Sequence, residues 1–119
     1  MSERIKKIFE AKGKKLVTFT TGGDPDLNTS LEILKTIINN GIDIIEIGMP
    51  FSDPMADGPA IQESSVRSLE NGTKINDIFE IVNSSESSSG CKSTIIRPST
   101  PVSAHLAVKL SIPKLNIEL

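Results

Sequence analysis

The feature that most constrains the fold is the isoleucine-rich run at residues 42–47, which carries apolar side chains at both odd and even positions. A strand with one solvent-exposed face alternates apolar and polar residues, whereas a parallel strand covered on both faces has a nearly continuous run of apolar residues. A β-branched and aromatic run precedes it at residues 16–21. Between the two, apolar residues repeat at helical spacing from Asn28 or Thr29, either of which can cap a helix, to Gly41. This order predicts a βαβ unit.

Further helices are expected before and after this unit in the chain. Residues 5–9 place apolar side chains at i, i+3 and i+4, which predicts a short amphipathic helix. Residues 61–69 predict a helix that Asn71-Gly72 ends, and residues 75–82 have the most regular helical pattern in the chain. The alternation of strands and helices predicts an α/β fold with at most one domain.

The organised pattern ends near Asn83. A serine run follows, and scattered prolines interrupt the remainder without sustained periodicity. We therefore expect an organised part at residues 1–83 and an irregular tail at residues 84–119. Weak patterns in the tail are consistent with short strands at residues 94–97 and 114–119 and with a helix at residues 103–110.

Composition and charge argue against several classes of function. Thirteen basic and fifteen acidic residues give a net charge of −2, with no dense basic run for a nucleic acid backbone. The single cysteine, Cys91, cannot form an internal disulfide. The N-terminus lacks the apolar core of a signal peptide, and no run of about eighteen apolar residues would span a membrane. We expect a cytoplasmic protein with neither a nucleic acid nor a membrane partner.

Glu46 is the first candidate for chemistry. It lies near the C-terminal end of the predicted strand at residues 42–47, among isoleucines that provide few polar partners for a carboxylate. A carboxylate in such a place suits general acid/base catalysis, because one group can both take and give a proton. The alternative is a glutamate at a strand end that faces solvent or pairs with a lysine.

Two aspartates, Asp53 and Asp57, follow in a loop stiffened by three prolines. Active sites of (β/α)8 barrels are built from the C-terminal ends of strands and the loops that follow them, which is where Glu46 and both aspartates fall. The alternative for the aspartates is turn chemistry, because aspartate commonly bonds its own backbone in turns.

Other residues are weaker candidates. The loop at residues 22–25, Gly-Gly-Asp-Pro, could hold a phosphate, but two glycines and a proline more often make only a turn. Cys91 and His105 lie in the tail and are interpreted as incidental surface residues. No Cys/His cluster has metal-ligand spacing, so no metal is expected.

Residues 45–58, which read I-E-I-G-M-P-F-S-D-P-M-A-D-G, resemble the signature of tryptophan synthase alpha chains. Phe19 and the loop at residues 21–25 lie at the expected distance upstream, and residues 59–62 follow directly. The Arg67, Leu69 and Gly72 pattern adds to the resemblance. The resemblance covers about residues 1–83 and implies the N-terminal portion, about two βα units, of a (β/α)8 TIM barrel.

The resemblance also implies an activity. Tryptophan synthase alpha chains are lyases that cleave indole-3-glycerol phosphate to indole and glyceraldehyde 3-phosphate by a retro-aldol reaction. By this likeness, Glu46 would move protons at indole C3 and the glycerol hydroxyl, while Asp57 would hold the indole N–H. Phe19 matches an apolar wall of the indole pocket.

A partner is implied in the same way. In this family the alpha chain docks on a pyridoxal-phosphate beta subunit in an α2β2 tetramer and itself uses no cofactor, and Asp53 matches the segment that touches that partner. A whole barrel needs about 250 residues. Two hypotheses therefore apply to this chain: a truncated or frameshifted alpha chain with an unclosed barrel, or a catalytically dead fragment that at most binds the beta subunit.

Overall fold

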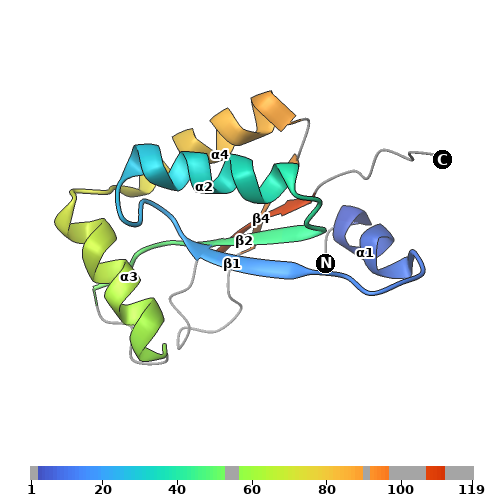
Figure 1. Cartoon of the computed structure of the whole chain (residues 1–119), viewed down its shortest axis with the longest axis horizontal. Helices are drawn as coiled ribbons and strands as arrows, with labels where there is room; N and C mark the ends of the chain where they lie inside the picture. The colour runs from blue at the N-terminus through green and yellow to red at the C-terminus, as the bar shows by residue number, and fades with distance from the viewer. Residues whose placement is uncertain (1–2, 53–56, 90–91, 97–106, 112–119) are drawn as a thin grey trace.

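The computed structural model describes residues 3–52, 57–89, 92–96 and 107–111 of the chain (Figure 1). Helices and strands alternate through the first half, as the sequence predicts. In chain order the elements are α1 (Glu3–Glu10), β1 (Val17–Thr21), α2 (Leu27–Asn39), β2 (Ile44–Gly48), α3 (Pro59–Glu70), α4 (Ile75–Ser89), β3 (Lys92–Ile96) and β4 (Ala107–Ser111). Among the described helices, none is long and apolar enough to cross a membrane.

The described strands form a four-stranded sheet in the order β1-β2-β4-β3. β1 and β2 pair in parallel, with Val17 opposite Ile44 and Thr21 opposite Gly48. This pairing confirms the βαβ unit. β4 pairs antiparallel with both β2 and β3, which departs from the all-parallel sheet of a complete barrel.

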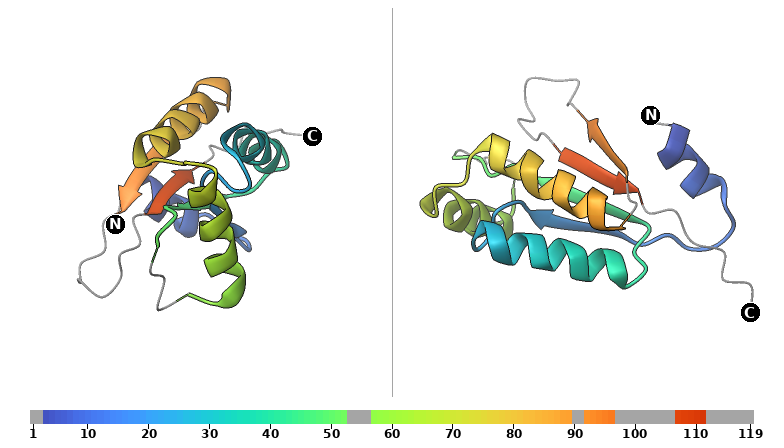
Figure 2. Two further views of the ribbon diagram at one scale, coloured as in Figure 1. Left: turned by 90° about the vertical axis from the view of Figure 1, so that its left-hand side faces the viewer. Right: turned by 90° about the horizontal axis from the view of Figure 1, so that it is seen from above.

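The core lies between the sheet and two helices. α2 and α4 run side by side over one face of the sheet, as the views in Figures 1 and 2 agree. The buried cluster there consists of Leu34, Ile38, Ile45, Ile47, Met49, Ile78, Ile81 and Val82. Successive side chains of a strand point to opposite faces, so Ile45 and Ile47 face these helices and Glu46 and Gly48 face the other side. The helix predicted between the two strands and the helix predicted at residues 75–82 are both confirmed.

The remaining two helices lie at opposite ends of the strands. Figure 1 shows α1 near the beginnings of β1 and β2, and α3 near their ends. Ile5 is the residue that α1 buries. The helix predicted at residues 61–69 is confirmed within α3, and Asn71 follows α3 as its C-cap. The C-terminal edge of the parallel strand pair therefore has α3 beside it.

Asp26, rather than Asn28 or Thr29, caps α2. Its carboxylate accepts hydrogen bonds from the backbone N–H of Thr29 at 2.8 Å and from the Thr29 hydroxyl at 2.8 Å. The bond from the backbone N–H of Thr29 is the main reason why the pKa of Asp26 is lowered. Aspartate is a strong N-cap residue, and the helix therefore begins two to three residues earlier than a cap at Asn28 or Thr29 would place it.

The expectation that ordered structure ends near Asn83 is wrong. α4 continues through the serine run to Ser89. Ser85 is fully buried, and its hydroxyl donates to the backbone oxygen of Val82 at 2.7 Å. A serine that bonds a carbonyl of the preceding turn satisfies its own hydroxyl, so a helix can contain it. Serine content therefore did not mark an irregular segment here.

Two strands follow α4. β3 overlaps the strand predicted at residues 94–97. β4 (Ala107–Ser111) shows that the helix predicted at residues 103–110 is wrong at residues 107–110. Backbone pairing with β2 and β3 on both sides outweighs a weak helical pattern, because strand formation depends on neighbouring strands more than on intrinsic preference. The strand predicted at residues 114–119 lies outside the described residues.

Candidate active site

The loop after β1 is held by side chains of α3. Thr21 Oγ1 and Ser64 Oγ lie 2.6 Å apart and share a hydrogen bond, and Ser68 Oγ donates to the backbone oxygen of Gly22 at 2.7 Å. All three hydroxyl side chains are buried. Ser64 and Ser68 are four residues apart and so lie on one face of the helix. Helix α3 thus docks on the end of β1 through hydrogen bonds rather than through an apolar stripe.

An ion pair joins the same two segments nearer the surface. Arg67 donates from Nε to Asp24 Oδ1 at 2.8 Å and from Nη2 to Oδ2 at 3.0 Å. The side-chain hydrogen bond with Asp24 raises the pKa of the Arg67 guanidinium. Asn71 Nδ2 donates to the backbone oxygen of Pro25. The loop at residues 22–25 is therefore anchored on α3 along its length.

The serine contact predicts a measurable change in stability. Replacing Ser68 by alanine removes the hydrogen bond to the buried oxygen of Gly22, and we expect the free energy of unfolding to fall by about 1–3 kcal/mol. Urea unfolding measures the change. Ser87→Ala is the matched control, because the Ser87 hydroxyl also donates to a helix carbonyl, Asn83 O at 3.0 Å, but at an exposed position. A similar cost for both substitutions would contradict the anchoring role of Ser68.

Glu46 lies in the middle of β2 and is half-buried. The register places Phe19 of β1 opposite Glu46 on one side and Lys109 of β4 opposite it on the other. Glu46 projects from the sheet face that α2 and α4 leave uncovered, since these helices cover the alternate residues Ile45 and Ile47. Glu46 therefore lies, partly exposed, on the face of the sheet opposite α2 and α4.

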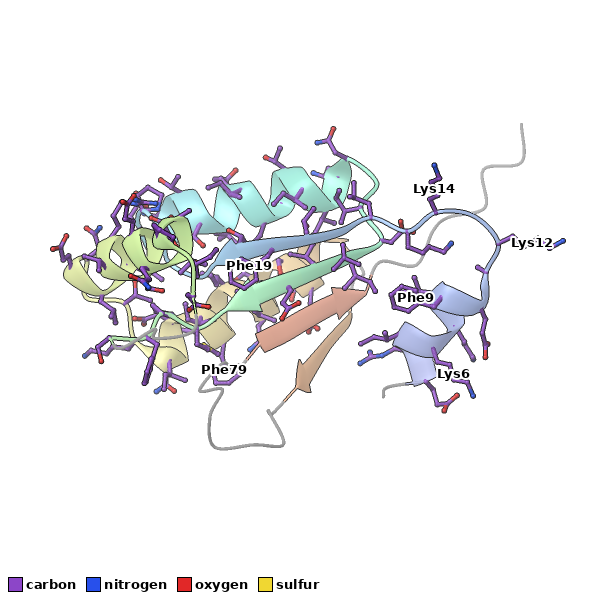
Figure 3. The ribbon with its side chains drawn as sticks, turned by 90° about the horizontal axis from the view of Figure 1, so that it is seen from below. Lys6, Phe9, Lys12, Lys14, Phe19 and Phe79 are labelled. Carbon is purple, nitrogen blue, oxygen red and sulfur yellow. The ribbon has the colours of Figure 1, made fainter. Side chains whose placement is uncertain are left out.

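Phe19 shares this face with Glu46. Its side chain is 47% exposed, and Figure 3, seen from the side opposite α2 and α4, shows it on β1. The ring reaches diagonally across to the end of β2, because a Cβ placed on Gly48 would lie 2.5 Å from Phe19 Cζ. The structure therefore brings together Phe19 and Glu46, two of the candidate residues from the sequence.

Asp57 lies in the loop that connects β2 to α3, and it is half-buried. Its backbone oxygen accepts a hydrogen bond from Gln62 Nε2 at 2.8 Å. The loop leaves the C-terminal end of β2, and α3 lies at the end of β1, so Asp57 is at the expected edge of the sheet. That the carboxyls of Asp57 and Glu46 act on one substrate, as the family resemblance implies, stays a prediction. Asp53, Cys91 and His105 lie outside the described residues.

A shallow hollow of about 440 Å³ lies elsewhere, on α3. Its lining consists of Pro59, Gln62, Glu63, Val66 and Arg67, and so includes none of the three described candidate residues. We assign the hollow no role in the candidate site. Among the residues that the structure describes, no group of histidine, cysteine, aspartate and glutamate is arranged to hold a metal ion.

Sequence reasoning did not assign a role to several residues around the site. The pairs Ser68 with Gly22 and Arg67 with Asp24 are each more than forty residues apart in the chain. The only local signal was the spacing of Ser64 and Ser68, which places two hydroxyls on one helix face. Gly48 lies within the signature at residues 45–58, but its relation to Phe19 becomes visible only in three dimensions.

The chain is similar to known proteins over most of its length. The family model described as "Tryptophan synthase alpha chain" matches residues 5–96, and so extends past Asn83 to the end of β3. The tryptophan synthase alpha chain of Thermoanaerobacter pseudethanolicus is 55% identical over 83 residues, which is 66% of this chain and 32% of that protein. The chain spans 31–32% of the length of several such curated relatives.

Solved structures agree with the sequence comparison. Tryptophan synthase from M. tuberculosis, in its aminoacrylate-bound form, superposes with a TM-score of 0.69 at 29% identity, over 75% of this chain and 38% of that chain. A mutant tryptophan synthase alpha subunit from Pyrococcus furiosus gives a TM-score of 0.58 at 42% identity, over 61% and 29% of the two chains. The predicted fold class, the N-terminal portion of a TIM barrel, is confirmed. This chain belongs to the tryptophan synthase alpha chain family.

Proposed function

We propose that this chain supplies the N-terminal third of a tryptophan synthase alpha chain, a lyase of tryptophan biosynthesis. The reaction is the retro-aldol cleavage of indole-3-glycerol phosphate to indole and glyceraldehyde 3-phosphate. The observation that carries the proposal is the pairing of Phe19 with Glu46, which places an aromatic ring beside a half-buried carboxylate on the face of the sheet opposite α2 and α4. This pair lies within the segment that matches the family.

The proposed chemistry uses the two carboxylates in different ways. Glu46 delivers a proton to indole C3 and takes the proton of the glycerol hydroxyl next to the bond that breaks. The C–C bond then cleaves, its electron pair returns to the indole ring, and the hydroxyl carbon becomes the aldehyde of glyceraldehyde 3-phosphate. Asp57 accepts a hydrogen bond from the indole N–H and offsets the positive charge of the protonated ring. Phe19 packs against the ring.

We further propose that the complete protein works in the cytoplasm with a pyridoxal-phosphate beta subunit, in an α2β2 tetramer, and needs no cofactor or metal of its own. Asp53 is assigned to that interface. Support comes from a solved tryptophan synthase complex of Pyrococcus furiosus, whose matched chain is 42% identical to this one. The main alternative is that this polypeptide is catalytically dead and at most binds the beta subunit.

The length of the chain argues that the 119-residue polypeptide by itself does not turn over substrate. Precise positioning of a substrate contributes about 7–11 kcal/mol of barrier lowering, and much of it depends on groups distributed around a complete site. The present chain spans 31–32% of the length of its relatives. The two carboxylates without the rest of the barrel are therefore expected to give no detectable indole.

A chimera tests the proposal. Residues 1–83 of this chain replace the aligned segment of the Thermoanaerobacter pseudethanolicus alpha chain, which is 55% identical over 83 residues. We expect the chimera to release indole from indole-3-glycerol phosphate, and the unmodified 119-residue chain to release none. A chimera that folds and binds the beta subunit but releases no indole would favour the catalytically dead alternative.

A further inference from the structure

Gly48 ends β2 at the point where the ring of Phe19 crosses from β1. A Cβ placed on Gly48 would lie 2.5 Å from Cζ, 2.9 Å from Cε2 and 3.5 Å from Cε1 of that ring. The first two distances are shorter than carbon atoms approach without displacement. The ring therefore occupies the space that any larger residue at position 48 would need for its own side chain.

The backbone of Gly48 is held by hydrogen bonds, whereas the Phe19 ring is partly exposed. The oxygen of Gly48 accepts a hydrogen bond from the N–H of Gly22 at 2.9 Å, and Gly48 is paired with Thr21 in the parallel ladder. Phe19 in contrast is 47% exposed and has solvent beside it. A methyl group at position 48 would therefore displace the ring rather than the strand.

The displaced ring would move relative to Glu46. Phe19 is the register partner of Glu46, and Gly48 projects from the same face two residues further along β2. With glycine at position 48, the ring lies across the end of β2 next to the carboxylate. An alanine there would turn the ring away from β2 and remove the flat apolar surface from beside Glu46.

We infer that Gly48 is a positioning residue. Because it has no side chain, the Phe19 ring can lie across β2, where a flat bicyclic aromatic ring can pack against it beside Glu46. This inference deepens the proposed function and rests on it for the identity of the ligand, the indole ring. A mismatch of one methylene between an apolar pocket and its ligand changes the discrimination between ligands by about 10–200-fold. Gly48 thereby sets the affinity for the aromatic part of the substrate without touching the reacting atoms.

The experiment uses the 119-residue chain, labelled with ¹³C in the phenylalanine rings, and indole as the probe. Gly48→Ala is expected to move the Phe19 ring resonance toward the position of a solvated ring, and to weaken indole binding by about tenfold or more. The Phe19 resonance is assigned by its loss in Phe19→Leu. The control is Gly58→Ala, because Gly58 has φ −68° and, apart from its two chain neighbours, no described residue has an atom within 4 Å of its Cβ position.

A double substitution separates positioning from a general structural effect. If Gly48 acts through Phe19, then adding Gly48→Ala to Phe19→Leu weakens indole binding no further, while the urea midpoint of each variant stays near that of the unsubstituted chain. A Phe19 resonance that does not move in Gly48→Ala would overturn the inference, as would additive losses of affinity. If the chimera releases no indole, the proposed function fails, and the position of the Phe19 resonance in the 119-residue chain still decides the role of Gly48.

Discussion

Replacing Glu46 by glutamine in the active chimera is expected to lower kcat/KM for indole release by about a hundredfold or more. General acid/base catalysis contributes about 10²–10⁴ in rate, and glutamine keeps the shape of the side chain but cannot exchange a proton. Each tenfold change corresponds to about 1.36 kcal/mol of barrier height. Because the amide is nearly isosteric, the fold and the half-buried position on β2 are retained. Continuous measurement of indole release by the variant and by the unsubstituted chimera gives the ratio of their kcat/KM values.

Two comparisons make this result specific to the site. Asp57→Asn is expected to reduce the rate as well, because the amide carries no charge to offset that of the protonated ring. Glu70→Gln is the matched control, since Glu70 is an exposed residue at the end of α3 and loses its charge in the same way. A Glu46→Gln chimera that keeps the rate of the Glu70→Gln chimera would remove Glu46 from the chemistry.

Replacing Gly23 by alanine is expected to cause the largest loss of stability. Gly23 has φ +77°, a left-handed conformation that costs an L-residue about 1–2 kcal/mol. In addition, a Cβ at this position would lie 2.6 Å from Thr73 Cγ2 and 2.7 Å from Ser68 Oγ, both on buried side chains. Overpacking of this kind costs about 1–3 kcal/mol more. A combined loss of about 2–5 kcal/mol is a large part of the 5–15 kcal/mol that stabilises a typical domain.

Gly72→Ala measures the backbone part of this effect alone, so its comparison with Gly23→Ala isolates the steric part. Gly72 has the same φ of +77°, but apart from its two chain neighbours no described residue has an atom within 4 Å of its Cβ position. Urea unfolding of both variants should therefore show the backbone cost alone for Gly72→Ala and a clearly larger cost for Gly23→Ala. Equal costs would mean that the contacts with Thr73 and Ser68 relax freely, and that the loop after β1 is less tightly anchored than the structure indicates.

Much of the first half of the fold could be predicted because its signals are local. The parallel pairing of β1 with β2 follows from two apolar runs on either side of one helical repeat, and the structure confirms that the two strands pair in parallel. Glu46 is identified from its place in the predicted strand at residues 42–47, and Phe19 from the resemblance to the tryptophan synthase alpha chain family. The periodicity of apolar side chains decides the pattern of strands and helices, and periodicity is visible in one dimension.

The sequence by itself determined the order of strands and helices in the βαβ unit and the identity of the candidate carboxylates. Only the tertiary structure decided that Ser68 and Arg67 anchor the loop after β1, that β4 lies antiparallel beside β2, and that Gly48 makes room for Phe19. These contacts join residues that are far apart in the chain. Hydrogen bonding and steric fit between such residues depend on where the whole fold places them, so no local pattern records them.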